Sequence, residues 1–335
     1  MIKYAKKDVD LFFCTQPFSR IEIYENGDVF NCCPPFINYY SIGNIYKSSF
    51  DEIWNGEKVR DLRKKILSSD FSLCADNCNL KMNYECDSTE FSETVDSYPS
   101  EISISSDNIC NVRCKICRDS QHGIKHDKEK LEEEIENLWL PVFKNAKILR
   151  FGCSGEPFAS IKEMLIMKKA AEKYPDLKFH FHTNGILGNE KKLKELKVFD
   201  KIDIITLSLH SASRWTYNKI VLGGNWDKVM ENIKLYSKMR QDNLIKQFRM
   251  IFVVYSENYK DMEKFANLAK KYNAVAEFWA LRLVENTQIG QNFEKYSLLN
   301  ENHKHHKDLI KILKKPVFES ENVILYPELK KLREG

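Results

Sequence analysis

The stretch Cys110-Asn111-Val112-Arg113-Cys114-Lys115-Ile116-Cys117 sets three cysteines at short spacing in a chain of 335 residues. Thiolates spaced in this way hold either an iron-sulfur cluster or a tetrahedral zinc ion. A structural zinc ion takes four protein ligands, so this run needs a fourth ligand from elsewhere to bind zinc. A [4Fe–4S] cubane held by three cysteines keeps one iron open to a small molecule. The spacing therefore favours an iron-sulfur cluster, with zinc as the alternative.

The chain around and after this run alternates short β-rich segments with amphipathic helical stretches, a pattern typical of βα units and a parallel sheet. The six expected strands are Glu101–Ser105, Lys147–Gly152, Leu177–His182, Ile204–His210, Phe248–Tyr255 and Val275–Leu283. Apolar residues recur at three- and four-residue intervals in the expected helices, near residues 128–139, 160–174, 190–198, 213–219, 226–242 and 259–272. Six units are fewer than the eight of a closed TIM barrel.

Polar motifs follow these strands at their carboxyl ends, where the chemistry of parallel barrels collects. They are Gly152-Cys153-Ser154-Gly155-Glu156-Pro157, Thr183-Asn184-Gly185, and Ser208 in Leu207-Ser208-Leu209-His210. Together with the cysteine run, they resemble the radical SAM superfamily. The resemblance implies an α/β fold with a partial (β/α)6 TIM-like barrel. It also implies a [4Fe–4S] cluster on Cys110, Cys114 and Cys117, with S-adenosylmethionine on the open iron. Reductive cleavage would then release a 5'-deoxyadenosyl radical that abstracts a substrate hydrogen.

The same resemblance implies a set of S-adenosylmethionine contacts. The segment Ser154, Gly155, Glu156 and Pro157 stands where the family binds the methionine amino group, with serine in place of a glycine. Glycine allows close backbone approach, and exposed carbonyls accept hydrogen bonds from an ammonium group. The other expected contacts are Thr183, Asn184 and Ser208 near the ribose and methionine, Ile116 against adenine, and Arg282 near the carboxylate or the substrate.

Six further cysteines precede the barrel, and this segregation indicates a separate metal module. Within it, Ile21–Phe30 reads as a hairpin whose two strands are joined by Asn26-Gly27. The order of hairpin, helix and later cysteines resembles a SPASM or twitch auxiliary-cluster domain, which usually follows the barrel. The resemblance implies one auxiliary [4Fe–4S] cluster, for which we expect the ligands Cys14, Cys32, Cys74 and Cys78. Cys33 and Cys86 are alternative candidates for these ligand positions, and a structural zinc ion is an alternative to the auxiliary cluster.

We therefore expect an auxiliary domain over residues 1–95, a barrel over 96–290 and an extension over 291–335. Within the extension we expect a helix from Phe293 to Lys315 and a strand at Val323–Tyr326. We expect His303, His305 and His306 to lie on an exposed helix rather than in a metal site. No apolar run of 18 residues and no signal core occur, so we expect a cytoplasmic protein without a membrane segment.

Partners follow from charge and from the resemblance. Residues 1–100 carry 11 Lys and Arg against 16 Asp and Glu, and residues 101–292 carry 32 against 25. Lysines are spread along helices rather than interleaved with aromatics, so no nucleic-acid partner is expected. The family chemistry implies an external electron donor such as flavodoxin or ferredoxin. By analogy the substrate is a peptide or protein, with a sugar-like small molecule as the second possibility. A non-catalytic iron-sulfur or zinc protein for electron transfer or binding is the third reading.

Overall fold

The computed structural model describes residues 12–75, 78, 82–83, 91–117, 127–283 and 289–335. The fold is mixed α/β with mostly parallel strands, which confirms the predicted class. The chain divides into two compact units. The first comprises residues 1–107, 124–154 and 165–178, and the second comprises 108–123, 155–164 and 179–335.

The first unit is built on five strands in the order β8, β6, β2, β3 and β4. Their bounds are Ile148–Phe151 for β8, Glu101–Ser105 for β6, Arg20–Tyr24 for β2, Asp28–Phe30 for β3 and Gly43–Asn44 for β4. The predicted hairpin is present as β2 and β3, and Gly27 takes the left-handed conformation at its turn, with φ of 82°. Strand β2 also pairs in parallel with β6, setting Arg20 opposite Glu101. The hairpin thus extends the sheet, which the sequence did not predict.

Short helices and helical turns accompany the strands of the first unit. They are α1 (Gln16–Ser19), α2 (Phe50–Trp54), α3 (Glu57–Leu67) and α4 (Lys128–Glu134), with a π-helical turn at Ile135–Trp139 and 3-10 turns at Pro34–Ile37 and Leu140–Phe143. A capping box between Ser49 and Glu52 starts α2. Helix α3 packs Leu62 and Ile66 against Phe18, Phe30 and Cys32, so this core also holds the cysteine-bearing segments together.

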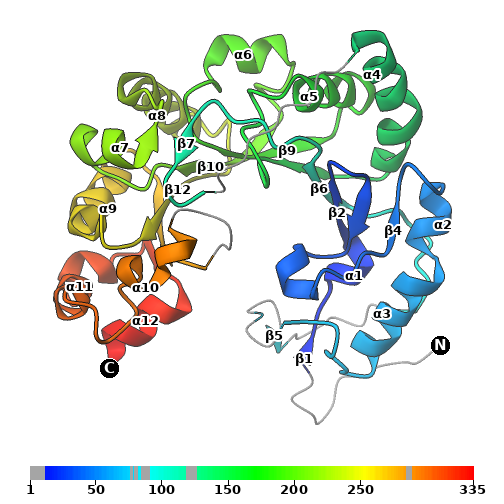
Figure 1. The fold of residues 1–335 in the computed structure, drawn as a ribbon. Helices are drawn as coiled ribbons and strands as arrows, with labels where there is room; N and C mark the ends of the chain where they lie inside the picture. The colour runs from blue at the N-terminus through cyan, green and yellow to red at the C-terminus, as the bar shows by residue number, and fades with distance from the viewer. Residues whose placement is uncertain (1–11, 76–77, 79–81, 84–90, 118–126, 284–288) are drawn as a thin grey trace. The chain divides into compact units, whose positions relative to one another are not determined.

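The second unit carries five parallel strands in the order β14, β13, β12, β10 and β9. Their bounds are Val323–Leu325, Val275–Ala280, Gln247–Val254, Ile202–Ser208 and Lys178–Thr183, respectively. Helices α6 (Glu190–Glu195), α7 (Arg214–Ile220), α8 (Trp226–Gln241) and α9 (Met262–Lys271) follow the strands in turn (Figure 1). Helix α5 (Ile161–Lys173) connects β8 to β9 in the chain. The six predicted barrel strands are therefore β6, β8, β9, β10, β12 and β13.

The C-terminal residues differ from the prediction. One helix was expected from Phe293 to Lys315, but α10 ends at Tyr296 and α11 begins at His306. The break has a local cause. The His303 ring donates a hydrogen bond from Nε2 to the Lys295 carbonyl oxygen and accepts one at Nδ1 from the His305 amide, and these two bonds hold the chain in a loop. The remaining elements are α12 (Pro327–Glu334), the short strands β1 (Phe12–Phe13), β5 (Met82–Asn83), β7 (Arg113–Cys114) and β11 (Val221–Leu222), and 3-10 turns at Tyr259–Asp261, Gly290–Asn292 and Pro316–Glu319.

Strand β14, expected within an extension, pairs in parallel with β13 and adds a further strand to the sheet. Within the described part of the chain, no helix combines the length and apolar character needed to cross a bilayer.

Candidate functional site

The three-cysteine loop is anchored by a two-stranded ribbon. Strand β7 pairs with β11 so that Cys114 lies opposite Val221, and the Lys115 amide donates to the Ile220 carbonyl at 3.0 Å. A turn in which the Cys117 amide donates to the Cys114 carbonyl, at 3.0 Å, folds the third cysteine back toward the second. The segment from Cys114 to Cys117 therefore forms a compact loop at the end of this ribbon.

The thiols of this loop are close enough to affect one another electrostatically. Burial, with smaller contributions from the neighbouring Cys117 and Cys110, raises the pKa of Cys114 to about 12. Three soft sulfur donors with no hard oxygen ligand among them fit an iron-sulfur cluster, since such clusters are held by thiolates. Burial also raises the pKa of Cys110, so metal binding would have to displace the protons that burial retains on Cys110 and Cys114.

The Glu156 carboxylate ties two loops together beside the cysteines. It accepts hydrogen bonds from the Thr183 hydroxyl at 2.8 Å, the Asn184 amide at 2.7 Å and the Phe158 amide at 3.4 Å. Complete burial nonetheless raises the pKa of Glu156 to about 7. The predicted Gly-Glu-Pro and Thr-Asn-Gly motifs are thus joined through this one side chain.

Asn184 links those motifs to the cysteine loop. Its side-chain amide donates to the Asn111 Oδ1 at 2.8 Å, and its Nδ2 lies 3.7 Å from the Cys110 sulfur. Its own Oδ1 accepts from the Ile186 amide at 3.1 Å, which fixes the orientation of the amide group. Sequence reasoning missed Asn111, because an asparagine between two cysteines carries no spacing signal.

Gly155 allows the second motif to approach the cysteine loop closely. The Glu156 amide donates to the Ile109 carbonyl at 2.8 Å, and a Cβ added to Gly155 would stand 2.4 Å from that same oxygen. Only glycine fits there. Ser154 before it is half-buried and Pro157 after it is buried.

Ser208 contributes to a polar group at the ends of β9 and β10. Its hydroxyl lies 2.5 Å from the His182 Nε2. His210 accepts from the Val253 amide through Nδ1 at 3.1 Å. Burial lowers the pKa of His182 to about 4, and burial together with His182 lowers that of His210 to about 3, so both rings are neutral at physiological pH. Sequence reasoning missed both histidines, although each borders a motif residue.

Two other predicted contacts are less enclosed. Ile116 is half-buried between two of the cysteines. Arg282 is exposed after β13, and its guanidinium lies over the Trp279 ring at 5.9 Å, near Tyr326. Their roles toward S-adenosylmethionine stay predictions.

The auxiliary cysteines Cys14, Cys32, Cys74 and Cys78 all line one small pocket of about 20 Å³ in the first unit, along with Gln16, Pro17, Ile37, Leu62, Ile66 and Phe71. Burial raises the pKa of Cys14 to about 11 and that of Cys32 to about 12, while Arg20 opposes both shifts. Within the described residues, no three Cys, His, Asp or Glu side chains converge to the spacing of a single-ion site. Cys33 packs on the same core without lining the pocket, and Cys86 lies outside the described residues.

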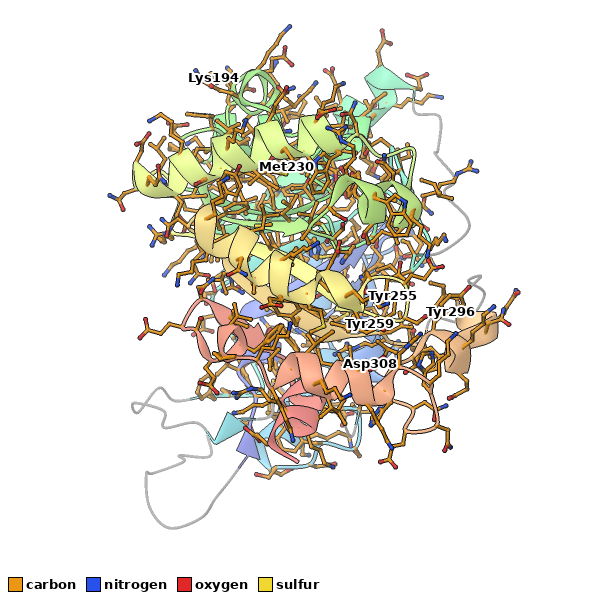
Figure 2. The ribbon with its side chains drawn as sticks, turned by 90° about the vertical axis from the view of Figure 1, so that its left-hand side faces the viewer. Lys194, Met230, Tyr255, Tyr259, Tyr296 and Asp308 are labelled. Atoms are coloured by element: carbon orange, nitrogen blue, oxygen red, sulfur yellow. The ribbon has the colours of Figure 1, made fainter. Side chains whose placement is uncertain are left out.

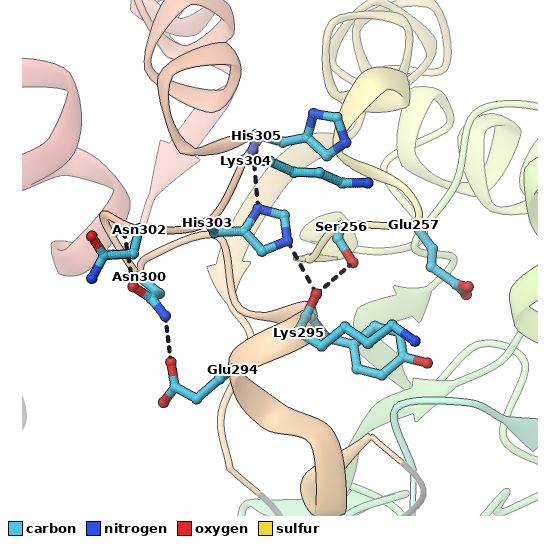
Figure 3. A pocket seen from close by; sticks show the side chains of 10 residues that line it. Ser256, Glu257, Glu294, Lys295, Asn300, Asn302, His303, Lys304 and His305 are labelled. Carbon is cyan, nitrogen blue, oxygen red and sulfur yellow. Dashed lines mark hydrogen bonds between the residues drawn. The ribbon is translucent and has the colours of Figure 1, made fainter.

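A second, larger pocket of about 500 Å³ lies between the loop after β12 and residues 294–305 (Figure 3). Glu257 on its wall pairs with Lys115 of the cysteine loop at 3.0 Å and with Lys219 at 3.5 Å. His303 and His305, expected on an exposed helix, line this pocket, and His306 is buried with its Nδ1 2.8 Å from the Leu298 carbonyl oxygen. Tyr255, Tyr259 and Tyr296 gather on the same side of this unit (Figure 2).

Two family models match the chain. Residues 104–269 match the radical SAM superfamily, and residues 14–79 match an iron-sulfur cluster-binding domain of the SPASM type. The first match covers the cysteine loop and both glycine motifs. The second covers the four pocket-lining cysteines of the first unit.

The curated relatives match over part of their length. An uncharacterized protein of Methanocaldococcus jannaschii is 29% identical over 170 residues, covering 50% of this chain and 51% of that protein. A probable GTP 3',8-cyclase of Saccharolobus islandicus is 26% identical over 170 residues, covering 51% of this chain and 53% of that protein. The chain thus spans about half the length of the curated relatives it matches.

Among solved structures, that of a histidine-tagged anSMEcpe with bound AdoMet is 20% identical to this chain, with a TM-score of 0.45. The match covers 67% of this chain and 62% of that one. The radical SAM match implies a [4Fe–4S] cluster and S-adenosylmethionine, and the SPASM match implies an auxiliary iron-sulfur cluster. On the two family matches, the chain belongs to the radical SAM superfamily and carries a SPASM iron-sulfur domain on the N-terminal side of its radical SAM domain.

Proposed function

We propose that this chain is a radical SAM enzyme that generates a 5'-deoxyadenosyl radical and abstracts a hydrogen atom from its substrate. The observation that carries the proposal is the connected set of Cys110, Asn184 and Glu156, which joins the cysteine loop to both predicted S-adenosylmethionine motifs. A structural zinc loop would have no need of such a connection.

In this proposal Cys110, Cys114 and Cys117 hold the cluster. When bound, the cluster and S-adenosylmethionine together supply one-electron cleavage of a carbon–sulfur bond. The protein's part is positioning and exclusion of water. Glu156 fixes Thr183 and Asn184, and Asn184 in turn contacts the Cys110 sulfur and Asn111. The close approach at Gly155 keeps exposed backbone next to the cysteine loop.

We further propose that Cys14, Cys32, Cys74 and Cys78 hold one auxiliary cluster. Their common pocket, within an apolar core, supports this choice over Cys33. A cluster with four cysteine ligands has no open iron for a substrate group, so its proposed role is to accept an electron from an oxidised product.

A peptide or protein is the proposed substrate, by analogy with other enzymes that carry SPASM-like domains. The small-molecule alternative gains support from the relative named as a probable GTP 3',8-cyclase, which acts on a nucleotide. Function resides in the site rather than in the fold, so the substrate must be found by assay.

The test is detection of 5'-deoxyadenosine by mass spectrometry after anaerobic cluster reconstitution, with S-adenosylmethionine and dithionite. The control is a variant with Cys110, Cys114 and Cys117 all replaced by alanine. We expect product from the wild type and none from the control. Equal yields from both proteins would refute the proposal. Candidate peptides and small molecules are then ranked by how far each raises the yield.

A further inference from the structure

The outer surface of the cysteine loop combines exposed apolar side chains with cations. Trp215 on α7 is 73% exposed and Leu222 on β11 is 51% exposed. Lys219 lies over the Trp215 ring at 5.7 Å, and Arg113 on β7 is exposed directly opposite Leu222. We call Arg113, Trp215, Lys219 and Leu222 the α7–β7 patch. A lone exposed apolar residue needs no explanation, but an exposed tryptophan beside further apolar and cationic groups is typical of binding surfaces.

The patch stands directly behind Cys114. Successive residues of a strand point to opposite faces, and residues opposite each other across a ladder share a face. Arg113 and Leu222 therefore share the outer face of the ribbon, and Cys114 and Val221 share the inner one. Helix α7 likewise has an outer and an inner face, since Trp215 is exposed while Tyr217 is buried. The Tyr217 hydroxyl is near Cys114, and burial together with Cys114 raises its pKa. One layer of backbone separates the patch from the proposed cluster ligand.

The charge around the patch is positive. Strands β7 and β11 and helix α7 carry three cations, Arg113, Arg214 and Lys219, and no acidic residue, and Lys115 directly follows β7. Glu257 pairs with Lys115 and Lys219, and Asp227 pairs with Arg214. A surface of this kind attracts a partner with an acidic face, by long-range steering that salt weakens.

We propose that the α7–β7 patch is the docking surface for an acidic electron-transfer protein that reduces the cluster held by Cys110, Cys114 and Cys117. This inference rests on the proposed function. An anionic flavin hydroquinone on the partner gives up one electron and becomes the neutral semiquinone, and the cluster gains that electron, so no proton has to move. Trp215 and Leu222 exclude water where the partner contacts them, and their cationic neighbours Lys219 and Arg113 orient the partner.

The experiment uses the reconstituted full chain and chemically reduced flavodoxin as the probe. Oxidation of the flavodoxin hydroquinone is followed by anaerobic stopped-flow absorbance. The alanine variant of Cys110, Cys114 and Cys117 gives the background from the auxiliary cluster. We expect the double variant Trp215→Ala, Leu222→Ser to slow the background-corrected rate by about tenfold or more. Arg113→Glu should slow it as well, and added salt should slow the wild type.

Matched controls are Ile161→Ala, which removes an equally exposed apolar side chain, and Lys191→Glu, which reverses an exposed charge on α6. Both should keep the wild-type rate with flavodoxin. Reduction by dithionite, which needs no docking surface, should proceed equally in every patch variant.

The proposal fails if the patch variants oxidise flavodoxin at the wild-type rate. It also fails if their reduction by dithionite slows in parallel, because the patch would then support the loop's structure rather than a partner. These rates do not depend on S-adenosylmethionine. A wild type that accepts electrons yet forms no 5'-deoxyadenosine would therefore contradict the proposed function alone.

Discussion

Glu156 shows how a single buried carboxylate organises the candidate site. Three donors face it, yet burial dominates and raises its pKa from an ordinary value of 4.5 to about 7. A raised pKa means that the folded protein holds the proton more tightly than the unfolded chain does. This contribution to stability is fully present below about pH 4.5, declines as the pH rises, and is lost once the pH has passed about 7.

The pH dependence gives a first prediction for the protein without clusters. Between pH 4.5 and 7 the free energy of unfolding should fall by about 3 kcal/mol through Glu156 alone. The variant Glu156→Gln cannot titrate and should lack this component. Urea denaturation of both proteins across this range measures the difference, and parallel pH profiles would contradict the assignment.

Gly155 is required by geometry rather than by chemistry. Since an added Cβ would meet the Ile109 carbonyl oxygen, Gly155→Ala should cost about 1–3 kcal/mol of stability and displace the loop that leads to the cysteines. We expect less iron per chain after reconstitution, measured by colorimetric assay. Gly223→Ala is the control, because its positive φ strains an alanine but its Cβ would stand in ordinary van der Waals contact, 3.8 Å from the Asn111 carbonyl oxygen. Full iron loading in the Gly155 variant would show that the close approach is dispensable.

The sequence predicted the motifs of the site better than their connections. Spacing identified the cysteines and placed the Gly-Glu-Pro and Thr-Asn-Gly segments after strands, and the structure joins these segments through Glu156. Which atom of Glu156 meets which donor depends on three-dimensional packing. His182 and Asn111 each adjoin a motif residue, but the sequence does not reveal their contacts, because the partners of each lie far away along the chain.

At the scale of elements, the four auxiliary cysteines come from separate segments that one core brings together. Cys14 precedes α1, Cys32 follows β3, and Cys74 and Cys78 lie in the segment of chain after α3. We predict that Cys74→Ala lowers the reconstituted iron content from about eight to about four atoms per chain. Cys33→Ala should retain all of it, because Cys33 does not line the pocket. Iron analysis together with EPR measures the clusters that each variant holds. If the Cys33 variant loses iron and the Cys74 variant does not, Cys33 and not Cys74 is a cluster ligand.

The bounds of the strands were predicted better than the pairing between strands. Strand β6 has the predicted bounds, and the other five differ by a few residues at their ends, because alternating apolar residues mark a strand wherever it pairs. The pairing of β2 with β6 and of β14 with β13 was not predicted. Register between distant segments depends on which faces are buried together, and no local pattern encodes it.

At the scale of the whole molecule, each compact unit contains its own set of predicted cluster ligands. Cys14, Cys32, Cys74 and Cys78 belong to the first unit, and the Cys110–Cys117 loop belongs to the second. A cluster binds the folded unit and not the unfolded chain, so its binding free energy adds to the stability of the unit that holds it. Loss of one cluster should therefore loosen one unit and spare the other.

Hydrogen exchange tests this division directly. In a reconstituted Cys14→Ala, Cys74→Ala variant, amides of α3 and of β2 and β3 should exchange faster than in the wild type, because the segments around the pocket lose their common anchor. Amides of α8 and α9 should keep their wild-type rates. Cys153→Ser, which changes an exposed cysteine outside both proposed ligand sets, is the control. Equal acceleration in α3 and α8 would mean that the two units unfold as one, and that the auxiliary cluster stabilises the whole chain rather than the unit that binds it.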